Sequence, residues 1–339
     1  MADELYEHIE RLKSGLSGIS KNPLLDLFPD NKLREIDRRA IQEPFIRAQR
    51  KDMLRHLVSA KIDHSEHIEH AFSLFNEIDV FDHLKGKCSI QPVFKTKGPT
   101  PDFLLNLANG SYINLELKTI FFADSTNVIR NIQDQYLKVN IHIEGVRSGK
   151  ISDTEGPIVS WNSFRKPGAQ NVSRYDIIQL IQGKLDKVAN MKQLQYEDNP
   201  AILMIDFAPL DYHFFLQEAL PYYLFPNNAC ILSGIFWHVC FGKIGERTME
   251  WPEFPGKPCV GEAMIREGLL YRNWPVRAIV IGLGMGEGKR LIGLHAADME
   301  DYNILQTLHS ICDFVNNDLN TNYIDIGCDP LKQYANKMV

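Results

Sequence analysis

Residues 101–119 alternate between apolar and polar side chains with the two-residue period of β-strands. One set of positions is wholly apolar, and the other is polar except for Leu104. The apolar set is Phe103, Leu105, Leu107, Ile113, Leu115 and Leu117, and the polar set is Asp102, Asn106, Asn114, Glu116 and Lys118. Asn109-Gly110 lies between the two halves and is typical of a tight turn. The segment therefore predicts a hairpin with one buried face and one polar face.

The length of the turn decides whether the two apolar sets share a face. A two-residue turn at Asn109-Gly110 would pair Ala108 with Ser111 and place the sets on opposite faces, which burial of one face disfavours. We therefore predict a three-residue loop over residues 109–111, or a bulge of equivalent effect. Gly110 or a neighbour would be left-handed there. This loop pairs Ala108 with Tyr112.

The same patterns predict elements on both sides of the hairpin. Residues 1–60 look helical, with breaks at Asn22-Pro23 and Phe28-Pro29. A helix is expected over residues 64–75, with Ile68, Phe72 and Phe75 on its buried side. A strand at residues 88–94 contains Pro92, which requires a sheet edge or a bulge. Downstream, a helix is expected to start with the capping-box pattern at 173–176, and a buried strand is expected at 201–207. A strand or bent pair at 229–242 would continue the sheet. Residues 276–284 and 290–296 predict a hairpin, and residues 299–319 a closing helix.

Composition bounds the class of protein without fixing its function. The chain has 339 residues, 44% of them hydrophobic, and a formal net charge of −6, which speaks against a protein that coats nucleic acid but allows local contact. Its six cysteines form no CxxC pair, so reduced thiols are expected. The acidic, polar start does not resemble a signal peptide, and no apolar run has the length of a membrane span. We expect a cytoplasmic protein that does not bind a membrane.

Two carboxylates and an amine converge at one end of the polar face of the hairpin. Asp102 and Glu116 can bind a hard cation such as Mg²⁺ through oxygen. Such a metal lowers the pKa of its bound water and offsets charge that grows on phosphorus. Lys118 falls on the same face as Glu116, where it can orient or deprotonate the attacking water. The chemistry that fits these three residues is phosphodiester hydrolysis.

These residues resemble the PD-(D/E)xK nucleases, with Pro101-Asp102 as the first half of the motif and Glu116-Leu117-Lys118 as the second. The resemblance implies an α/β restriction-endonuclease-like core of the order αβββαβ, with a mixed sheet flanked by helices. That core would span residues 63–208, with an insertion at about 121–172. Residues 1–62 would be a helical N-terminal extension, and residues 209–339 a C-terminal elaboration that continues the sheet with additional strands and a helix.

The resemblance also implies a function and a set of site residues. It implies a Mg²⁺-dependent endonuclease for double-stranded DNA, in which Mn²⁺ can substitute, acting as a homodimer in restriction or another antiviral defence. Asp102 and Glu116 would hold the metal, and Lys118 would act on the water. Family members often carry a further metal-associated glutamate on the preceding helix. Glu69 is the first choice and Glu66 the second, while a solvated acidic helix face explains both equally well.

Two basic groups are candidates for nucleic-acid contact. One lies in the expected insertion and the following helix and would flank the metal site; its members are Arg147, Lys150, Arg165, Lys166 and Arg174, with Gln182 as an additional weak candidate. The other lies within residues 32–61, which hold nine basic and four acidic side chains. Phosphate contact is one interpretation of this second group, and a solvated helix face is the favoured one.

Other readings stay open. The chain could be a nuclease-like nucleic-acid-binding or assembly subunit without catalytic activity, or an unrelated α/β protein with a chance motif. The glycine-rich residues 282–289 do not match a phosphate-binding loop, because Leu283 stands where glycine is needed and Arg290 where Ser or Thr is needed. His64, His67 and His70 have residue types that bind zinc but not the spacing of a known zinc motif.

Overall fold

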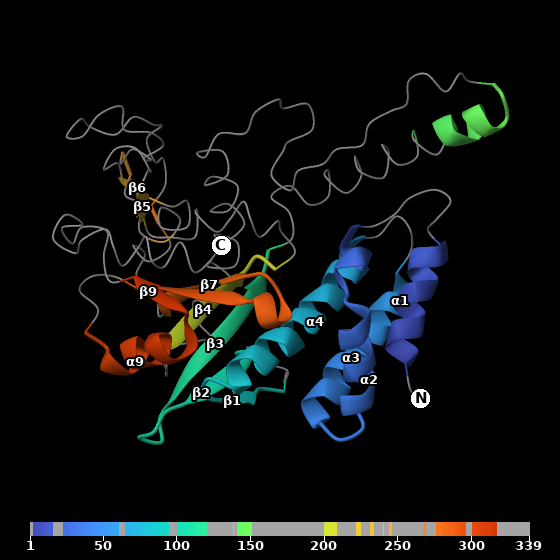
Figure 1. Ribbon diagram of the computed structural model, residues 1–339. Coiled ribbons are helices and arrows are strands. Elements are labelled where there is room, and N and C mark those ends of the chain that lie inside the picture. The colour runs from blue at the N-terminus through green and yellow to red at the C-terminus, as the bar shows by residue number, and fades with distance from the viewer. Residues whose placement is uncertain are drawn as a thin grey trace. The chain divides into compact units, whose positions relative to one another are not determined.

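The structure is a computed structural model that describes residues 3–15, 23–60, 65–94, 100–120, 138, 141–150, 200–208, 222–224, 231–233, 240, 244–245, 267–268, 276–295 and 300–316. The protein is α/β, with N-terminal helices, a mixed sheet and a C-terminal helix (Figure 1). The chain divides into two compact units, Met1–Val80 with Asp124–Asn171 and Phe81–Ala123 with Val172–Val339.

Prolines mark the joints between the N-terminal helices of the first unit. These elements are α1 (Glu4–Gly15), the 3₁₀ helix η1 (Pro23–Leu27), α2 (Asp30–Arg39), α3 (Pro44–Ser59) and most of α4 (Ser65–Lys85). Pro23 begins η1 and Pro29 directly precedes α2, so both predicted breaks are confirmed. A further break precedes Pro44, the first residue of α3, where the fixed φ of proline and its missing N–H are tolerated.

The predicted buried face of α4 is confirmed. Ile68, Phe72 and Phe75 are all buried, and Phe28 packs edge-on against the two phenylalanine rings, with ring centroids 5.2 and 5.4 Å apart. The helix runs ten residues beyond the predicted end at residue 75. The added segment contains no glycine or proline, and Gly86 follows it directly, so nothing in the local sequence stops the helix earlier.

A buried carboxylate on α2 joins three helices of the first unit. Asp37 accepts a hydrogen bond from the backbone N–H of Leu5 at 2.9 Å, in the first turn of α1. It is also paired with the guanidinium of Arg50 on α3, which reaches Glu4 on α1 at 2.7 Å. Asp37 thus satisfies a helix N-terminus from a distant part of the chain and holds the counter-charge of Arg50.

Replacing Asp37 with alanine should lower the free energy of unfolding by roughly 3 kcal/mol, because the buried pair loses one member and the α1 N–H loses its acceptor. Urea unfolding followed by circular dichroism measures this. The matched control is Glu4→Gln, which removes the half-exposed partner of the same arginine and should cost under about 1 kcal/mol. If the two substitutions lowered the free energy of unfolding equally, Asp37 would not be the residue that holds the three helices together.

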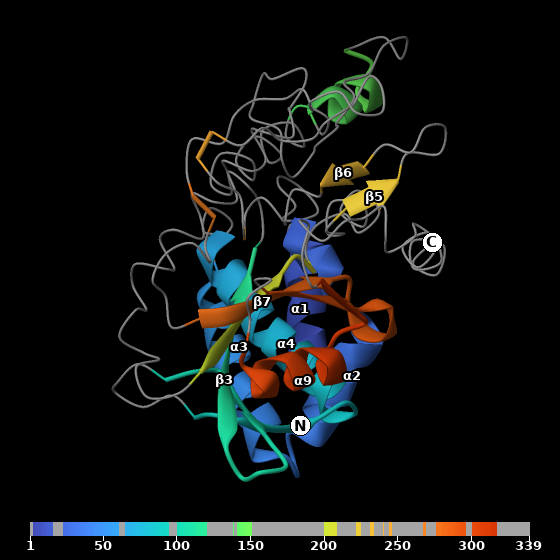
Figure 2. The same cartoon turned by 90° about the vertical axis from the view of Figure 1, so that its left-hand side faces the viewer.

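The second unit is built on a seven-stranded mixed sheet in the order β1-β2-β3-β4-β7-β8-β9 (Figures 1 and 2). Its strands are β1 (Ser89–Pro92), β2 (Phe103–Asn106), β3 (Tyr112–Thr119), β4 (Ala201–Asp206), β7 (Val276–Leu283), β8 (Arg290–His295) and β9 (Phe314–Asn316). β3, β4 and β7 are mutually parallel, while β1, β2 and β3 form an antiparallel meander. The helix α9 (Tyr302–Ile311) contacts β7, β8 and β9.

Several strand predictions are confirmed by this sheet. Pro92 lies on β1, which is an edge strand, so its missing N–H costs no ladder hydrogen bond. All six residues of β4 are buried, as expected for a continuous apolar run. β7 and β8 form the predicted antiparallel hairpin. On the apolar side of the β2–β3 hairpin, Phe81 from the last turn of α4 stacks on Phe103 with centroids 6.2 Å apart.

Other predictions differ from the structure. Residues 231–233, within the strand expected at 229–242, form β6 (Ile231–Ser233), which pairs with β5 (Tyr222–Leu224) in a separate two-stranded sheet and does not continue the main one. The closing helix ends at Ile311, well before residue 319. Asp313 exchanges hydrogen bonds with the backbone of Leu291, so residues after the helix gain strand pairing beside β8 and form β9. The helix expected from residue 173 lies outside the described residues.

The predicted domain boundaries at residues 62 and 208 stay predictions. Among the described helices, none combines the length and the apolar composition needed to cross a membrane.

Candidate functional site

The register of the β2–β3 hairpin places the candidate residues. Phe103 pairs with Leu115 and Asn106 with Tyr112, so the loop between Leu107 and Ser111 has three residues, Ala108 to Gly110. Gly110 is left-handed, with φ +82°, a conformation that glycine adopts at little cost. The predicted odd length and left-handed glycine are confirmed, while the loop begins one residue earlier than predicted. Both faces of the hairpin are therefore preserved.

This register sets Asp102 opposite Glu116. Asp102 and Glu116 form the next pair beyond Phe103–Leu115 on the side away from the loop. The predicted loop would have set Asp102 opposite Lys118. Opposed residues of antiparallel strands share a face of the sheet, so positions 102 and 116 do not face away from each other. Both carboxylates come to the same end of the hairpin.

The Asp102 carboxylate is fixed by the neighbouring strand. Asp102 is the residue before β2, and its Oδ2 accepts a hydrogen bond from the Leu117 N–H on β3 at 2.9 Å. Its own backbone oxygen accepts from the Val93 N–H at 3.0 Å. The side chain is buried, and a carboxylate that accepts a backbone N–H is held in one orientation.

Glu116 and Lys118 form an ion pair along β3. The Lys118 Nζ lies 2.6 Å from the Glu116 Oε1, the Glu116 side chain is 1% exposed and that of Lys118 is 26% exposed. Residues two apart on a strand point to the same face, which explains the contact. A carboxylate this deeply buried needs a counter-charge, and the lysine supplies one.

Two oxygen ligands of this kind suit a hard cation such as Mg²⁺. Within the described residues, no group of three His, Cys, Asp or Glu side chains is arranged to hold a metal ion. Mg²⁺ is commonly held by one or two carboxylates, with water and substrate phosphate completing its shell, whereas structural Zn²⁺ requires four ligands from the protein. The carboxylates of Asp102 and Glu116 are oxygen ligands of the type that Mg²⁺ and Mn²⁺ take, and metal binding at this site stays a prediction.

The predicted helix glutamates belong to the first unit. Glu69 is half-buried on α4 and Glu66 is exposed. Asp102 and Glu116 belong to the second unit, so the assistance of Glu69 at the metal stays a prediction.

The histidines near the start of α4 form a cluster with α3. The ring of His56 lies 5.1 Å from that of His70, with 27° between the ring planes, and 5.9 Å from that of His67. Burial, and then the neighbouring His70, Arg55 and His67, lower the pKa of His56 below its usual value. His64 lies outside the described residues, and the other three rings pack against one another.

Only part of the predicted DNA-contacting group can be located. Arg147 ends the helical segment 141–147, and Lys150 follows it; both side chains are exposed. Arg165, Lys166, Arg174 and Gln182 lie outside the described residues. The whole group stays a prediction.

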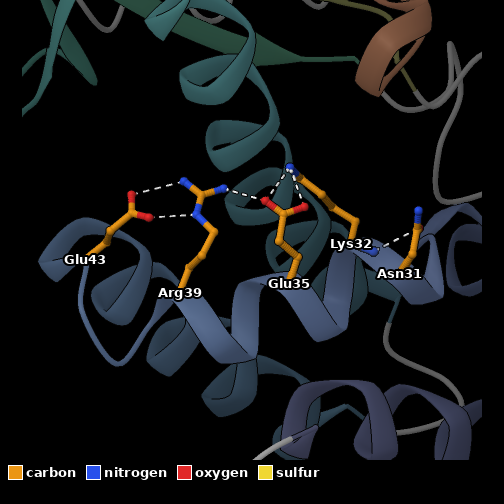
Figure 3. Close-up of polar contacts among 5 residues, drawn as sticks. All are labelled: Asn31, Lys32, Glu35, Arg39 and Glu43. Atoms are coloured by element: carbon orange, nitrogen blue, oxygen red, sulfur yellow. Dashed lines mark hydrogen bonds and ion pairs between the residues drawn. The ribbon is translucent and has the colours of Figure 1, made fainter.

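The basic stretch at residues 32–61 is largely engaged with acidic partners. In Figure 3 the guanidinium of Arg39 lies between two carboxylates, 2.8 Å from Glu35 and 2.8 Å from Glu43. Lys32 pairs with the same Glu35 at 3.2 Å, and Arg50 with Asp37 and Glu4 as described above. These pairs favour the solvated-face interpretation, because a cation already matched by a carboxylate gains less from a phosphate.

A buried ion pair was missed by the sequence analysis. Asp206, at the end of β4, and Lys289, just before β8, have side chains with 0% exposure, and Oδ2 and Nζ lie 2.6 Å apart. Asp206 Oδ1 also accepts from the Ala208 N–H at 2.8 Å. A β-carbon on Gly282 would lie 2.9 Å from the Asp206 Cγ, so only glycine leaves room for this carboxylate.

This pair lies on the other side of the sheet from the candidate metal ligands. The registered neighbour of Asp206 is Thr119, while Glu116 is paired with Leu203, so Asp206 and Glu116 point to opposite faces. In the sequence, the only sign of this ion pair was an acidic residue at the end of the apolar segment AILMID. Because Lys289 is buried against Asp206, it is not presented to a phosphate, which agrees with the rejection of a nucleotide loop at residues 282–289.

In comparisons with known proteins, no family model, no curated protein and no solved structure matches this chain. The function must therefore be inferred from the site itself.

Proposed function

We propose that this protein is a divalent-metal-dependent endonuclease that hydrolyses phosphodiester bonds of DNA. The observation that carries the proposal is the hairpin register, which brings Asp102 opposite Glu116 with the Lys118 ammonium 2.6 Å from the Glu116 carboxylate. Two carboxylates and a lysine at one end of a strand pair can serve such a hydrolysis, by holding a metal ion and by orienting the attacking water.

The order of elements supports a restriction-endonuclease-like core. The helix α4 is followed by the meander β1-β2-β3, and β4 then joins β3 in parallel. A parallel neighbour requires a crossover connection, and residues 121–199 supply enough chain for one. This order is compatible with the αβββαβ core that the PD-(D/E)xK resemblance implies.

Each residue of the site has a role in the proposed reaction. Asp102 and Glu116 would hold the cation, and Asp102 is already oriented by the Leu117 N–H. The Lys118 ammonium would orient the attacking water and stabilise the negative charge that develops beside it. A bound Mg²⁺ would supply a more acidic water and offset charge on the phosphate.

The proposal extends to the oligomeric state and the biological role of the protein. In a homodimer, each of the two sites would cleave one strand of the DNA duplex. A cytoplasmic role in restriction or another antiviral defence follows only from the resemblance to nucleases of this type.

The test is incubation of the purified protein with supercoiled plasmid, in EDTA and with Mg²⁺, Mn²⁺ or Ca²⁺. We expect nicked and linear DNA with Mg²⁺ or Mn²⁺ and none in EDTA. Parallel reactions with single-stranded DNA and RNA determine the substrate class. Absence of cleavage under every condition would refute the nuclease proposal. DNA binding by such an inert protein would favour the non-catalytic subunit, and absence of both would favour an unrelated α/β protein.

A further inference from the structure

The three side chains of the candidate site differ in their burial and in their contacts. Asp102 is held by a backbone hydrogen bond at 2.9 Å, and Glu116 is 1% exposed. Lys118 is about one quarter exposed and lies near the end of β3, one residue before Thr119. Of these three side chains, that of Lys118 is the most exposed.

We propose that Lys118 is an internal counter-ion that competes with the divalent cation for Glu116. This inference rests on the nuclease function proposed above. In the protein without metal, the ammonium neutralises the buried carboxylate. A divalent cation that binds Glu116 must displace the ammonium or bind beside it.

Electrostatics makes this competition strong. The ammonium lies 2.6 Å from one of the carboxylate oxygens that the cation needs. The carboxylate is shielded from water, so the repulsion between the lysine and a doubly charged ion is screened less than at an exposed site. The wild-type protein should therefore bind the cation more weakly than the same site with a neutral side chain at position 118.

Nucleic acid would relieve the competition. A phosphate at the site supplies an anion for the displaced ammonium and a further oxygen for the cation. Binding of phosphate and binding of metal would then favour each other, because coupling between two ligands is reciprocal. The effect would restrict tight metal binding to the complex with DNA, and Lys118 would contact the phosphate or the water only there.

The experiment measures Mn²⁺ binding in the absence of nucleic acid, by the electron paramagnetic resonance signal of free Mn²⁺. Lys118→Gln should bind Mn²⁺ at least about tenfold more tightly than the wild type, because the competing charge is removed. Lys118→Arg is the matched control that keeps the charge, and its Kd should stay near the wild-type value. Glu116→Gln should abolish Mn²⁺ binding both in the wild type and when combined with Lys118→Gln.

The outcomes separate this inference from the proposed function. Equal Kd values for the wild type and Lys118→Gln would overturn the counter-ion role and leave the nuclease proposal standing. Failure of the wild type, Lys118→Gln and Lys118→Arg alike to bind Mn²⁺ would count against the metal site itself and so against both. Lys118→Met is the second neutral variant, to be used if the glutamine variant does not fold.

Discussion

Replacing Glu116 with glutamine should lower the rate of metal-dependent DNA cleavage by roughly 10³-fold or more. Charge stabilisation by a catalytic metal is worth several kcal/mol, and each 1.4 kcal/mol changes a rate about tenfold. The substitution keeps the size of the side chain and removes only the anion, so the buried position at β3 stays filled. Initial rates of plasmid nicking at saturating Mg²⁺ measure the effect.

The control for this variant lies on the same polar face of the hairpin. Asn106 is at the far end of β2 from Asp102, beside the loop, and its amide donates a hydrogen bond to the Ser89 hydroxyl at 3.4 Å. Asn106→Ala should cleave DNA at the wild-type rate. Wild-type activity in a folded Glu116→Gln protein would remove Glu116 from the mechanism.

The second large effect is expected at the buried pair Asp206–Lys289. Lys289→Met should lower the free energy of unfolding by about 3–5 kcal/mol, because it leaves the Asp206 carboxylate without its cation in a site closed to water. Both side chains have 0% exposure, so solvent cannot compensate. Urea unfolding measures the loss, and hydrogen exchange at β4 and β7 locates it.

The double variant Lys289→Met with Asp206→Asn is the matched control. Its amide oxygen can still accept the Ala208 N–H that Asp206 holds at 2.8 Å, and neither charge remains buried. Removing both members of a buried pair is far less harmful than removing one, so the double variant should be more stable than Lys289→Met alone. If the double variant were no more stable than Lys289→Met, the loss of stability would not come from the unpaired charge of Asp206.

Most of the local structure near the candidate site could be predicted from the sequence. Alternation gave the two strands of the hairpin, and burial of one face required an odd loop length, which the register of Phe103 with Leu115 confirms. Pro92 required a sheet edge or a bulge, and β1 is an edge strand. In each case the deciding interaction lies between neighbours in the chain, or depends only on which face is apolar.

Other features depended on contacts between distant residues. The closing helix ends at Ile311, and Asp313 then pairs with the backbone of Leu291. Helical propensity alone does not predict this end of the helix. Residues 231–233 pair with β5 and not with the main sheet. The shift of the hairpin loop by one residue also changed the partner of Asp102 from Lys118 to Glu116.

The sequence by itself therefore determined which residues of the hairpin share a face, since side-chain alternation along a strand is a property of the backbone. It also determined that two carboxylates and a lysine belong to the polar face. Only the tertiary structure decided that Glu116 is buried and that Asp206 pairs with Lys289 across 83 residues. The burial of Glu116 and the pairing of Asp206 with Lys289 arise from packing between segments far apart in the chain, and no local pattern encodes them.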